Sequence, residues 1–195
     1  VFMTDDTWRR RHKFKNMFCL RQGIGEEDRR EGRIKEEYKC DVAFAGSVYG
    51  ERQQFVDALK KYYGDKFKVF NNVFNEDLYD LCASAKVIVA PKFPNDEFYW
   101  SSRFYMILGS GGFLVHPELY GLKEEFSEGK HYAGYKGGYD LIPTIDYFLK
   151  HDEERKAIKA QGQKRCYEVA TYKHRVKELC QMNLQTILMG NGLLL

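Results

Sequence analysis

The sequence predicts an α/β fold built on a doubly wound parallel sheet with C-terminal helices. From residue 41 onward, short apolar runs alternate with amphipathic stretches of about ten residues, the pattern of strands joined by crossover helices. The first run, 41–46, is mostly apolar and ends in glycine, which is typical of a buried parallel strand. Of the 195 residues, 44% are hydrophobic, so the chain can bury the core of one such domain.

Individual elements follow from the same pattern. Strands are expected at 41–46, 67–71, 86–91, 113–115 and 131–135. Helices are expected over 51–62, around 78–82, over 140–150 and 152–170, and from residue 171 onward. Asn75 and Thr171 precede two of these helices, and both residue types commonly cap a helix with their side chains. Because alternating strands and helices favour parallel pairing, the loops after the strands should lie along one edge of the sheet.

The first 39 residues fit this alternation less well. Residues 1–24 are predicted to form a strand, a basic helix and a second strand, and 26–39 is a charged stretch with the composition of a linker. The basic run at 9–15 is interpreted as a solvated helix face, with phosphate or nucleic-acid contact as the alternative. Because an isolated pair of strands is only marginally stable in water, this segment is expected to dock on other structure.

Composition and charge limit the classes of protein. The net charge of +3 is mild, so nucleic acid is possible as a partner but not favoured, whereas a small polyanionic ligand suits this charge. The five cysteines form no C-x-x-C pair, which indicates reduced structural thiols in a cytoplasmic protein and argues against a metal site. No apolar run reaches the length needed to span a bilayer, so no transmembrane segment is expected.

The stretch 97–115 carries the candidate site. It contains a polar loop, a short helix that begins near Ser101, Ser102 and Arg103, a glycine break and a buried strand. A helix N-terminus offers unpaired N–H groups to an anion, and an arginine adds a planar fork for two hydrogen bonds. The stretch therefore predicts a phosphate or carboxylate site at the carboxyl edge of the sheet. The alternative is an N-capped helix with a solvent-facing arginine.

Five motifs along the chain share their order with a known family. They are D-V-A-F-A-G-S at 41–47 with Arg52, W-S-S-R-F-Y-M-I-L-G-S-G-G-F at 100–113, G-L-K-E-E-F-S-E-G at 121–129, H-D-E-E-R at 151–155 and T-Y-K-H-R-V at 171–176. Together they resemble the C-terminal half of GT-B glycosyltransferases, closest to the spore-maturation-type relatives of the large retaining family 4. The resemblance implies a Rossmann-like domain that binds a nucleoside-diphosphate sugar and donates its sugar without a metal or other cofactor.

The same resemblance divides the chain into three parts. Residues 1–39 would be the remnant of an N-terminal acceptor domain plus a linker, 40–170 the nucleotide-sugar-binding domain, and 171–195 a C-terminal helix and tail. The acceptor site would then belong to a missing N-terminal domain. The 195 residues are accordingly expected to be about half of a two-domain enzyme that binds nucleotide but does not transfer sugar alone. The donor's base and sugar, the acceptor and the oligomeric state are left open.

The resemblance also implies roles for individual residues. Arg103, Arg52 and Lys92 are the candidate catalytic residues, because cations at these positions would stabilise the charge that grows on the departing diphosphate. The donor-binding candidates are Gly46, Ser47, Asn72, Val73, Tyr99, Ser101, Ser102, Met106, Gly111 and Gly112. The glycines would let the backbone lie close to the phosphates, since glycine lacks a Cβ. The loop at 71–73 would contact the base through backbone groups.

Two positions depart from the family. Family 4 enzymes hold the ribose hydroxyls with a glutamate five residues before the motif glycine and carry a second glutamate eight residues earlier. Met106 and Phe98 occupy these places here, so the ribose contact and the retaining mechanism are not carried over. A non-catalytic nucleotide-binding or scaffold module of the same fold is therefore a second hypothesis. A nucleic-acid-modifying glycosyltransferase that uses the basic run at 9–15 is a third.

Further ionisable residues surround the candidate site. His116 follows a predicted strand and is a candidate acceptor-side base, although a histidine at a strand end is more often structural. Glu118, Glu124 and Glu125 are expected to form a helix N-terminus and its solvated face.

Overall fold

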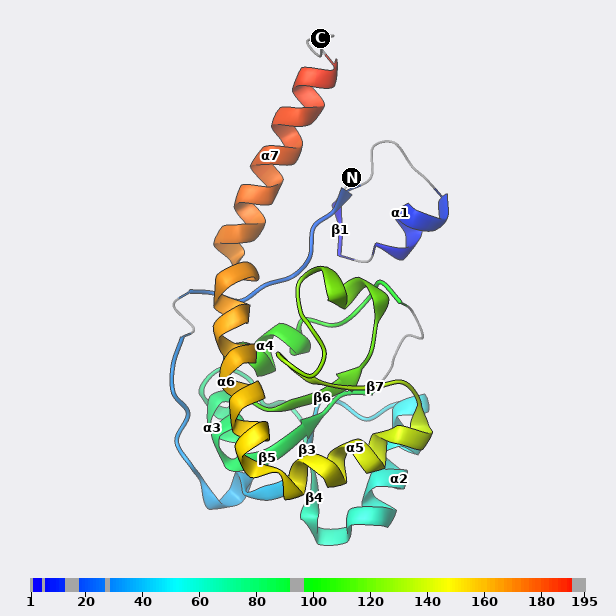
Figure 1. The fold of residues 1–195 in the computed structure, drawn as a ribbon, viewed down its shortest axis with the longest axis vertical. Coiled ribbons are helices and arrows are strands. Elements are labelled where there is room, and N and C mark those ends of the chain that lie inside the picture. The colour runs from blue at the N-terminus through cyan, green and yellow to red at the C-terminus, as the bar shows by residue number, and fades with distance from the viewer. Residues whose placement is uncertain (1, 5, 13–17, 27–28, 92–96, 191–195) are drawn as a thin grey trace.

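Five parallel strands form the central sheet, in the order β4-β3-β5-β6-β7 (Figure 1). The computed structural model describes residues 2–4, 6–12, 18–26, 29–91 and 97–190, without the side chains at 8, 11, 12 and 183–190. The strands are β3 (Cys40–Ala45), β4 (Phe67–Phe70), β5 (Ala85–Val89), β6 (Leu114–Pro117) and β7 (Ala133–Tyr135). The five expected strands and their parallel pairing confirm the doubly wound α/β fold.

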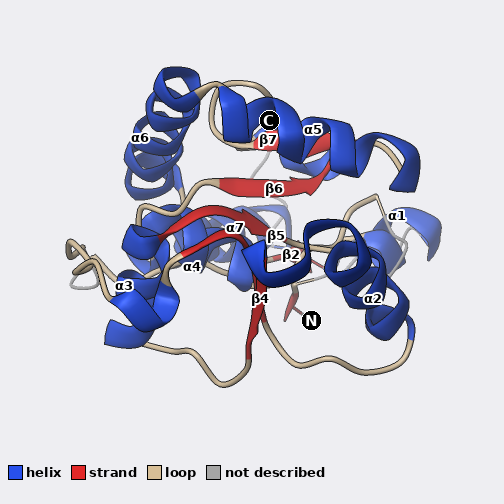
Figure 2. Cartoon of the chain, turned by 90° about the horizontal axis from the view of Figure 1, so that it is seen from below, coloured by secondary structure: helices blue, strands red, loops and turns tan. Residues whose placement is uncertain are grey.

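Helices lie between and after these strands and cover both faces of the sheet. They are α2 (Glu51–Tyr63), α3 (Glu76–Ser84), α4 (Arg103–Gly109), α5 (Gly138–Lys150), α6 (Asp152–Val169) and α7 (Tyr172–Gly190), with 3₁₀ turns η1 (Glu36–Tyr38), η2 (Gly64–Lys66) and η3 (Tyr120–Glu124). α2 and α5 pack on one face, whereas α3 and α4 pack on the other (Figure 2). The strands of the central sheet and their helices match the expected elements to within a few residues.

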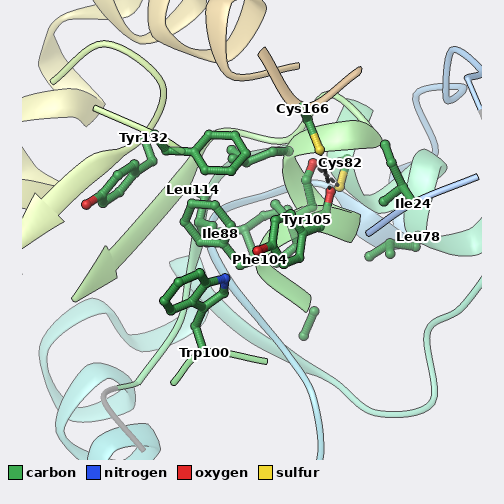
Figure 3. Packing of buried hydrophobic residues seen from close by; sticks show 14 of the residues in the cluster. Ile24, Leu78, Cys82, Ile88, Trp100, Phe104, Tyr105, Leu114, Tyr132 and Cys166 are labelled. Carbon is green, nitrogen blue, oxygen red and sulfur yellow. Dashed lines mark hydrogen bonds between the residues drawn. The ribbon is translucent and has the colours of Figure 1, made fainter. Parts of the chain in front are cut away.

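Side chains alternate between the two faces of each strand, and this alternation divides the core in two. In β3, Val42 and Phe44 pack with α2 and α5, whereas Ala43 and Ala45 pack with α3 and α4. The core on the α3/α4 side is rich in aromatic rings, and Figure 3 shows Phe104 in the middle of it. Because both faces are buried, the strands have apolar residues at successive positions, as expected for a covered parallel sheet.

The direction of the sheet order changes between β3 and β5. From β3 the chain goes to β4 on one side, and it then crosses to β5 on the other side. Phe44 of β3 pairs with Val89 of β5, so the two neighbouring strands end at the same edge. The loops that leave them run to opposite sides, which opens a crevice beyond the carboxyl ends.

The N-terminal residues form a separate small sheet. β1 (Phe2–Met3) pairs with β2 (Phe18–Cys19), also in parallel, and α1 (Thr7–His12) lies between them in the chain. Farther along, the Ile24 N–H donates to the Ala170 carbonyl at 3.0 Å, and the Tyr172 N–H donates to the Ile24 carbonyl at 2.8 Å. The segment that leaves the small sheet is therefore docked on the junction of α6 and α7.

The stretch expected to be a linker is fastened to α3. Asp80 of α3 is buried; its carboxylate accepts the Arg33 N–H at 2.8 Å and pairs with Lys35 Nζ at 2.8 Å. These partners hold the pKa of Asp80 below its usual value, the Lys35 hydrogen bond contributing most. A Cβ added at Gly32 would lie 1.9 Å from the Tyr79 carbonyl oxygen, so the backbone itself packs against the helix. Residues 32–35 therefore pack along the surface of α3.

Both expected caps precede their helices, but among the described residues neither side chain has a hydrogen bond to the backbone of its helix. Asn75 precedes α3 as expected, but its φ is 50° and its side chain makes no capping hydrogen bond, so that prediction was wrong. Asn tolerates this left-handed conformation better than most residues. Thr171 precedes α7, and its hydroxyl lies 2.7 Å from His174 Nδ1.

α7 extends beyond the sheet toward the side of the molecule that carries the N-terminal segment (Figure 1). Within the part of the chain that the structure describes, no helix combines the length and apolar character needed to cross a bilayer.

Candidate functional site

A cavity of about 290 Å³ lies beyond the carboxyl ends of β3, β5 and β6. Its walls come from the end of β3 with the loop into α2, the end of β5, the loop into α4, and the end of β6. This place is the point where the sheet order changes, and open α/β sheets bind their ligands there. The volume is near the lower end of small-molecule sites, which run from roughly 300 to 1,000 Å³.

The cavity is positively charged. Arg52 and Arg103 both line it, and none of its described lining residues is an aspartate or glutamate. Burial lowers the pKa of Arg103, and the positive charge of Arg52 lowers it further. A guanidinium remains charged in proteins, so this mutual repulsion is relieved by an anion rather than by loss of a proton.

Arg103 is the first residue of α4 and is held from behind. Its Nη1 donates to the Val73 carbonyl at 3.0 Å, and its guanidinium lies 5.2 Å from the centre of the Phe74 ring. Among the described residues, no carboxylate forms an ion pair with it, and Arg103 is half-buried. The backbone bond fixes the direction of the fork and leaves its charge available to a ligand in the cavity.

Arg52 approaches the cavity from the first turn of α2. Its Nη1 donates to the Ser47 carbonyl at 3.2 Å, and its guanidinium stacks on Tyr49 at 4.6 Å from the ring centre. Tyr49 also lines the cavity and is exposed. No sequence pattern pointed to Tyr49, because a single tyrosine does not stand out in an aromatic-rich chain.

The small residues around the arginines keep the cavity polar. Ser47, Ser101 and Ser102 line it, and Ser102 is the N-cap residue of α4 without a capping bond from its side chain. Gly46 lines it too, but the Gly46 N–H donates to the Phe70 carbonyl at 2.9 Å. A ligand can therefore approach Gly46 closely but does not find a free N–H there.

His116 lies at the end of β6, inside the strand rather than after it, and lines the cavity. It is buried, with its ring edge-to-face against Phe104 at a centroid distance of 5.0 Å. Burial lowers its pKa to about 4, so the imidazole is neutral at physiological pH. A general base with so low a pKa is weak at pH 7, which argues against the base role considered for it.

Tyr99 and Trp100 form the wall toward the N-terminal segment, and Trp100 is buried. The guanidinium of Arg21 stacks on the indole at 4.8 Å from its centre and pairs with Glu124 at 2.5 Å. Arg175 of α7 pairs with Glu125 through two contacts of 2.7 and 3.1 Å. The expected solvated face is therefore wrong for Glu125, whose carboxylate is largely buried against Arg175, whereas Glu124 is exposed while it pairs with Arg21.

Several predicted site residues lie away from the cavity. Neither Val73 nor Asn72 lines the cavity. The Val73 carbonyl is connected to it only by accepting a hydrogen bond from Arg103. Met106 borders a different, smaller cavity between α3 and α4. Gly111 and Gly112 follow the C-terminal end of α4, whose other end faces the charged cavity. Lys92 lies outside the described residues.

A family model named glycosyl transferase-like matches residues 31–181. The chain belongs to the glycosyl transferase-like family. The charged cavity thus belongs to a domain of a family whose name indicates sugar transfer. Among curated proteins, no sequence matches this family member significantly.

Solved structures place this glycosyl transferase-like chain among GT-B folds. HepE of Anabaena, in complex with UDP-glucose, matches with a TM-score of 0.72 at 9% identity, over 95% of this chain and 63% of HepE. Sucrose-phosphate synthase of Thermosynechococcus elongatus matches with a TM-score of 0.69 at 11% identity, over 97% of this chain and 58% of the synthase. TarM of S. aureus, in a complex that includes UDP, matches with a TM-score of 0.66 at 11% identity, over 93% of this chain and 43% of TarM.

These structural likenesses establish the fold, which is that of the C-terminal half of GT-B glycosyltransferases. The chain spans less than two thirds of the length of each of the three proteins. Among the described residues, no group of three or more His, Cys, Asp or Glu side chains is placed to hold a metal ion.

Proposed function

We propose that this chain is the donor-binding domain of a glycosyltransferase and that the charged cavity holds the diphosphate of a nucleoside-diphosphate sugar. The observation that carries the proposal is the pair Arg52 and Arg103 at the switch point of the sheet, in a cavity whose described lining has no carboxylate. The charge of a diphosphate is complementary to that of such a pair, and arginine forks match phosphate oxygens.

The same residues are suited to the chemical step. When the bond between the sugar and the diphosphate breaks, negative charge grows on the leaving phosphate oxygen. Arg103 and Arg52 would stabilise that charge more strongly in the transition state than in the ground state, which lowers the barrier. Lys92 keeps its proposed place as a third cation.

The remaining candidates divide between the two ends of the donor. Gly46, Ser47, Ser101 and Ser102 lie where phosphate oxygens and hydroxyls would meet them, and Tyr99 lies on the wall. We assign the base to the loop after β4, near Asn72 and Val73, because Arg103 ties this loop to the cavity. Met106, Gly111 and Gly112 retain at most an indirect role, since they line no part of the charged cavity.

Metal-independent transfer and a cytoplasmic location belong to the same proposal. Metal independence rests on the family resemblance. The location is supported by the five cysteines, which are free rather than joined in disulfides, as is usual in a reducing compartment.

Thermal unfolding in the presence of nucleotides tests the proposal. UDP, GDP, ADP and TDP would be compared with one another, with their monophosphates and with their common sugars. A nucleotide at about a hundredfold excess over its Kd adds about 2.7 kcal/mol to the free energy of unfolding, which is easily seen as a rise in Tm. If none of the diphosphates or their sugars raises the Tm, the proposal is wrong.

A nucleic-acid-modifying enzyme is less well supported. Arg9 and Arg10, in the basic run, form ion pairs with Asp6, and Arg10 also pairs with Glu124. Cations that are already paired release fewer counterions on binding DNA, so they contribute less affinity. The non-catalytic module remains the alternative to transfer, and turnover of a nucleotide sugar by the full-length protein would exclude it.

A further inference from the structure

Among the described residues that line the charged cavity, His116 is a buried polar side chain that the proposed chemistry does not use. It occupies β6, which lies between β5 and β7, and its Cα partner in β7 is Gly134. The neighbouring Val115 carbonyl accepts the Ala90 N–H at 2.9 Å. The backbone at His116 is therefore held between two neighbouring strands beside the cavity.

The contacts of His116 define which nitrogen carries the proton. Nδ1 lies 2.8 Å from the Pro117 carbonyl oxygen, and a carbonyl oxygen only accepts hydrogen bonds. Nδ1 must therefore be the N–H, and in the neutral ring Nε2 has a free lone pair. Nε2 has no hydrogen-bond partner among the described residues. It is not one of the described side-chain atoms that are both fully buried and without a partner, so it is still accessible.

The surroundings of the ring keep it in this state. Phe104 and Tyr132 both contact it edge-to-face, at centroid distances of 5.0 and 6.2 Å. The burial that these rings provide disfavours the charged imidazolium. His116 is thus an uncharged acceptor in a cavity whose described charged side chains are the two arginines.

We propose that Nε2 of His116 accepts a hydrogen bond from a hydroxyl of the glycosyl group of the donor. The proposal rests on the function given above and adds a specificity-determining residue to it. The two arginines recognise the diphosphate, which every nucleoside diphosphate shares. His116 recognises what is attached to it, because only a group with an O–H or N–H donor can pair with a lone pair.

Calorimetry with UDP and UDP-glucose separates the two contributions. In His116→Phe, the ring stays aromatic and keeps its packing against Phe104, but the acceptor is lost. We expect the affinity for UDP-glucose to fall about five- to tenfold, the usual effect of one hydrogen bond, with the affinity for UDP unchanged within twofold. His131→Phe is the matched control, since His131 is a buried histidine outside the cavity whose Nδ1 accepts the Ser127 N–H.

The outcomes are distinct. Equal weakening of UDP and UDP-glucose, or an unchanged ratio, would overturn the role of His116 while leaving the nucleotide site intact. If the wild-type chain binds neither ligand, the same pairs are measured with GDP and GDP-mannose, ADP and ADP-glucose, and TDP and TDP-glucose. Failure of all four diphosphates overturns the proposed function, and the His116 proposal with it.

A second measurement needs no variant and so does not depend on folding of a mutant. In ¹⁵N-histidine-labelled wild-type protein, the NMR spectrum of His116 should show a proton on Nδ1 and none on Nε2. UDP-glucose should shift the Nε2 resonance in the direction of an accepted hydrogen bond, whereas UDP should leave it in place. A protonated Nε2, or equal responses to both ligands, would contradict the proposal.

Discussion

Arg103 shows how much a single side chain can decide at this site. It is anchored by the Val73 carbonyl and faces a cavity without a described carboxylate. We expect Arg103→Ala to weaken binding of a nucleoside diphosphate by roughly 1.5–3 kcal/mol, the value of a hydrogen bond to a charged group. Arg103→Lys should recover only part of this, because a point charge cannot make the two parallel bonds of the fork. Calorimetry on the folded variants measures both.

The control for this prediction is an arginine that does not line the cavity. Arg30 is exposed, pairs with Glu76 at 3.3 Å and is not one of the residues that line the cavity. Arg30→Ala should leave the affinity unchanged, since exposed ion pairs contribute little. Unchanged affinity in Arg103→Ala would show that the anion binds elsewhere.

His116 also makes the stability of the fold depend on pH. Its pKa is about 4 in the folded chain and 6.5 in an ordinary environment, so the unfolded chain takes up a proton first as the pH falls. The stability associated with neutral His116 is complete above pH 6.5 and is lost between pH 6.5 and 4. At pH 5 the loss is about 2 kcal/mol relative to pH 7.5.

His116→Phe should remove this contribution. Urea unfolding at pH 7.5 and pH 5 would show a smaller loss of stability in the variant than in the wild type, by about 2 kcal/mol. The carboxylates contribute equally to both proteins and cancel in the comparison. An identical loss in both would mean that the imidazole is solvated and titrates normally.

At the scale of elements, α6 is positioned by a glycine that sequence reasoning passed over. A Cβ at Gly162 would lie 2.2 Å from the His131 carbonyl oxygen, so the helix contacts the segment before β7 through its backbone. Replacing a mid-helix glycine by alanine normally adds up to about 1 kcal/mol of helix stability. Overpacking costs roughly 1–3 kcal/mol, and it should prevail here because the obstructing atom belongs to the backbone.

We therefore expect Gly162→Ala to destabilise the protein by about 1 kcal/mol or more in urea unfolding. Gly138, the first residue of α5, is the matched control, because a Cβ added there meets nothing within 4 Å. Gly138→Ala should be neutral or slightly stabilising. A stabilised Gly162→Ala variant would show that α6 can move away from His131.

Which elements could be predicted depends on whether their signal is local. β3 and β5 were predictable because a strand covered on both faces needs consecutive apolar residues. The roles of Glu124 and Glu125 were not, since their partners Arg21 and Arg175 lie far away in the sequence. For the same reason, a charged stretch with linker composition gave no sign that it would bind along α3.

The candidate site divides in the same way. Arg103 and the serines before it were predictable, because a helix start, hydroxyls and an arginine occur in one short stretch. Gly111 and Gly112 belong to that stretch too, but α4 separates them from the cavity by its length. His116 required the structure, because its burial, tautomer and neighbouring rings come from elements brought together only by folding.

At the scale of the whole molecule, the described walls of the cavity come from one Rossmann-like unit. Transfer also needs an acceptor held in line with the departing diphosphate and a site that excludes water. We expect the 195-residue chain to bind nucleotide but not to glycosylate an acceptor. Mass spectrometry of candidate acceptors incubated with the chain and a donor that it binds is the measurement. Appearance of a glycosylated product would contradict this expectation.

The indole of Trp100 links the cavity to the N-terminal segment. One of its sides belongs to the cavity, and Arg21 of the N-terminal segment stacks on the ring. In a closed thermodynamic cycle, the free energy by which the docked N-terminal segment strengthens ligand binding equals the free energy by which the ligand strengthens docking of that segment. A donor that contacts Trp100 from the cavity and the segment that holds Trp100 through Arg21 would therefore change each other's binding by the same factor.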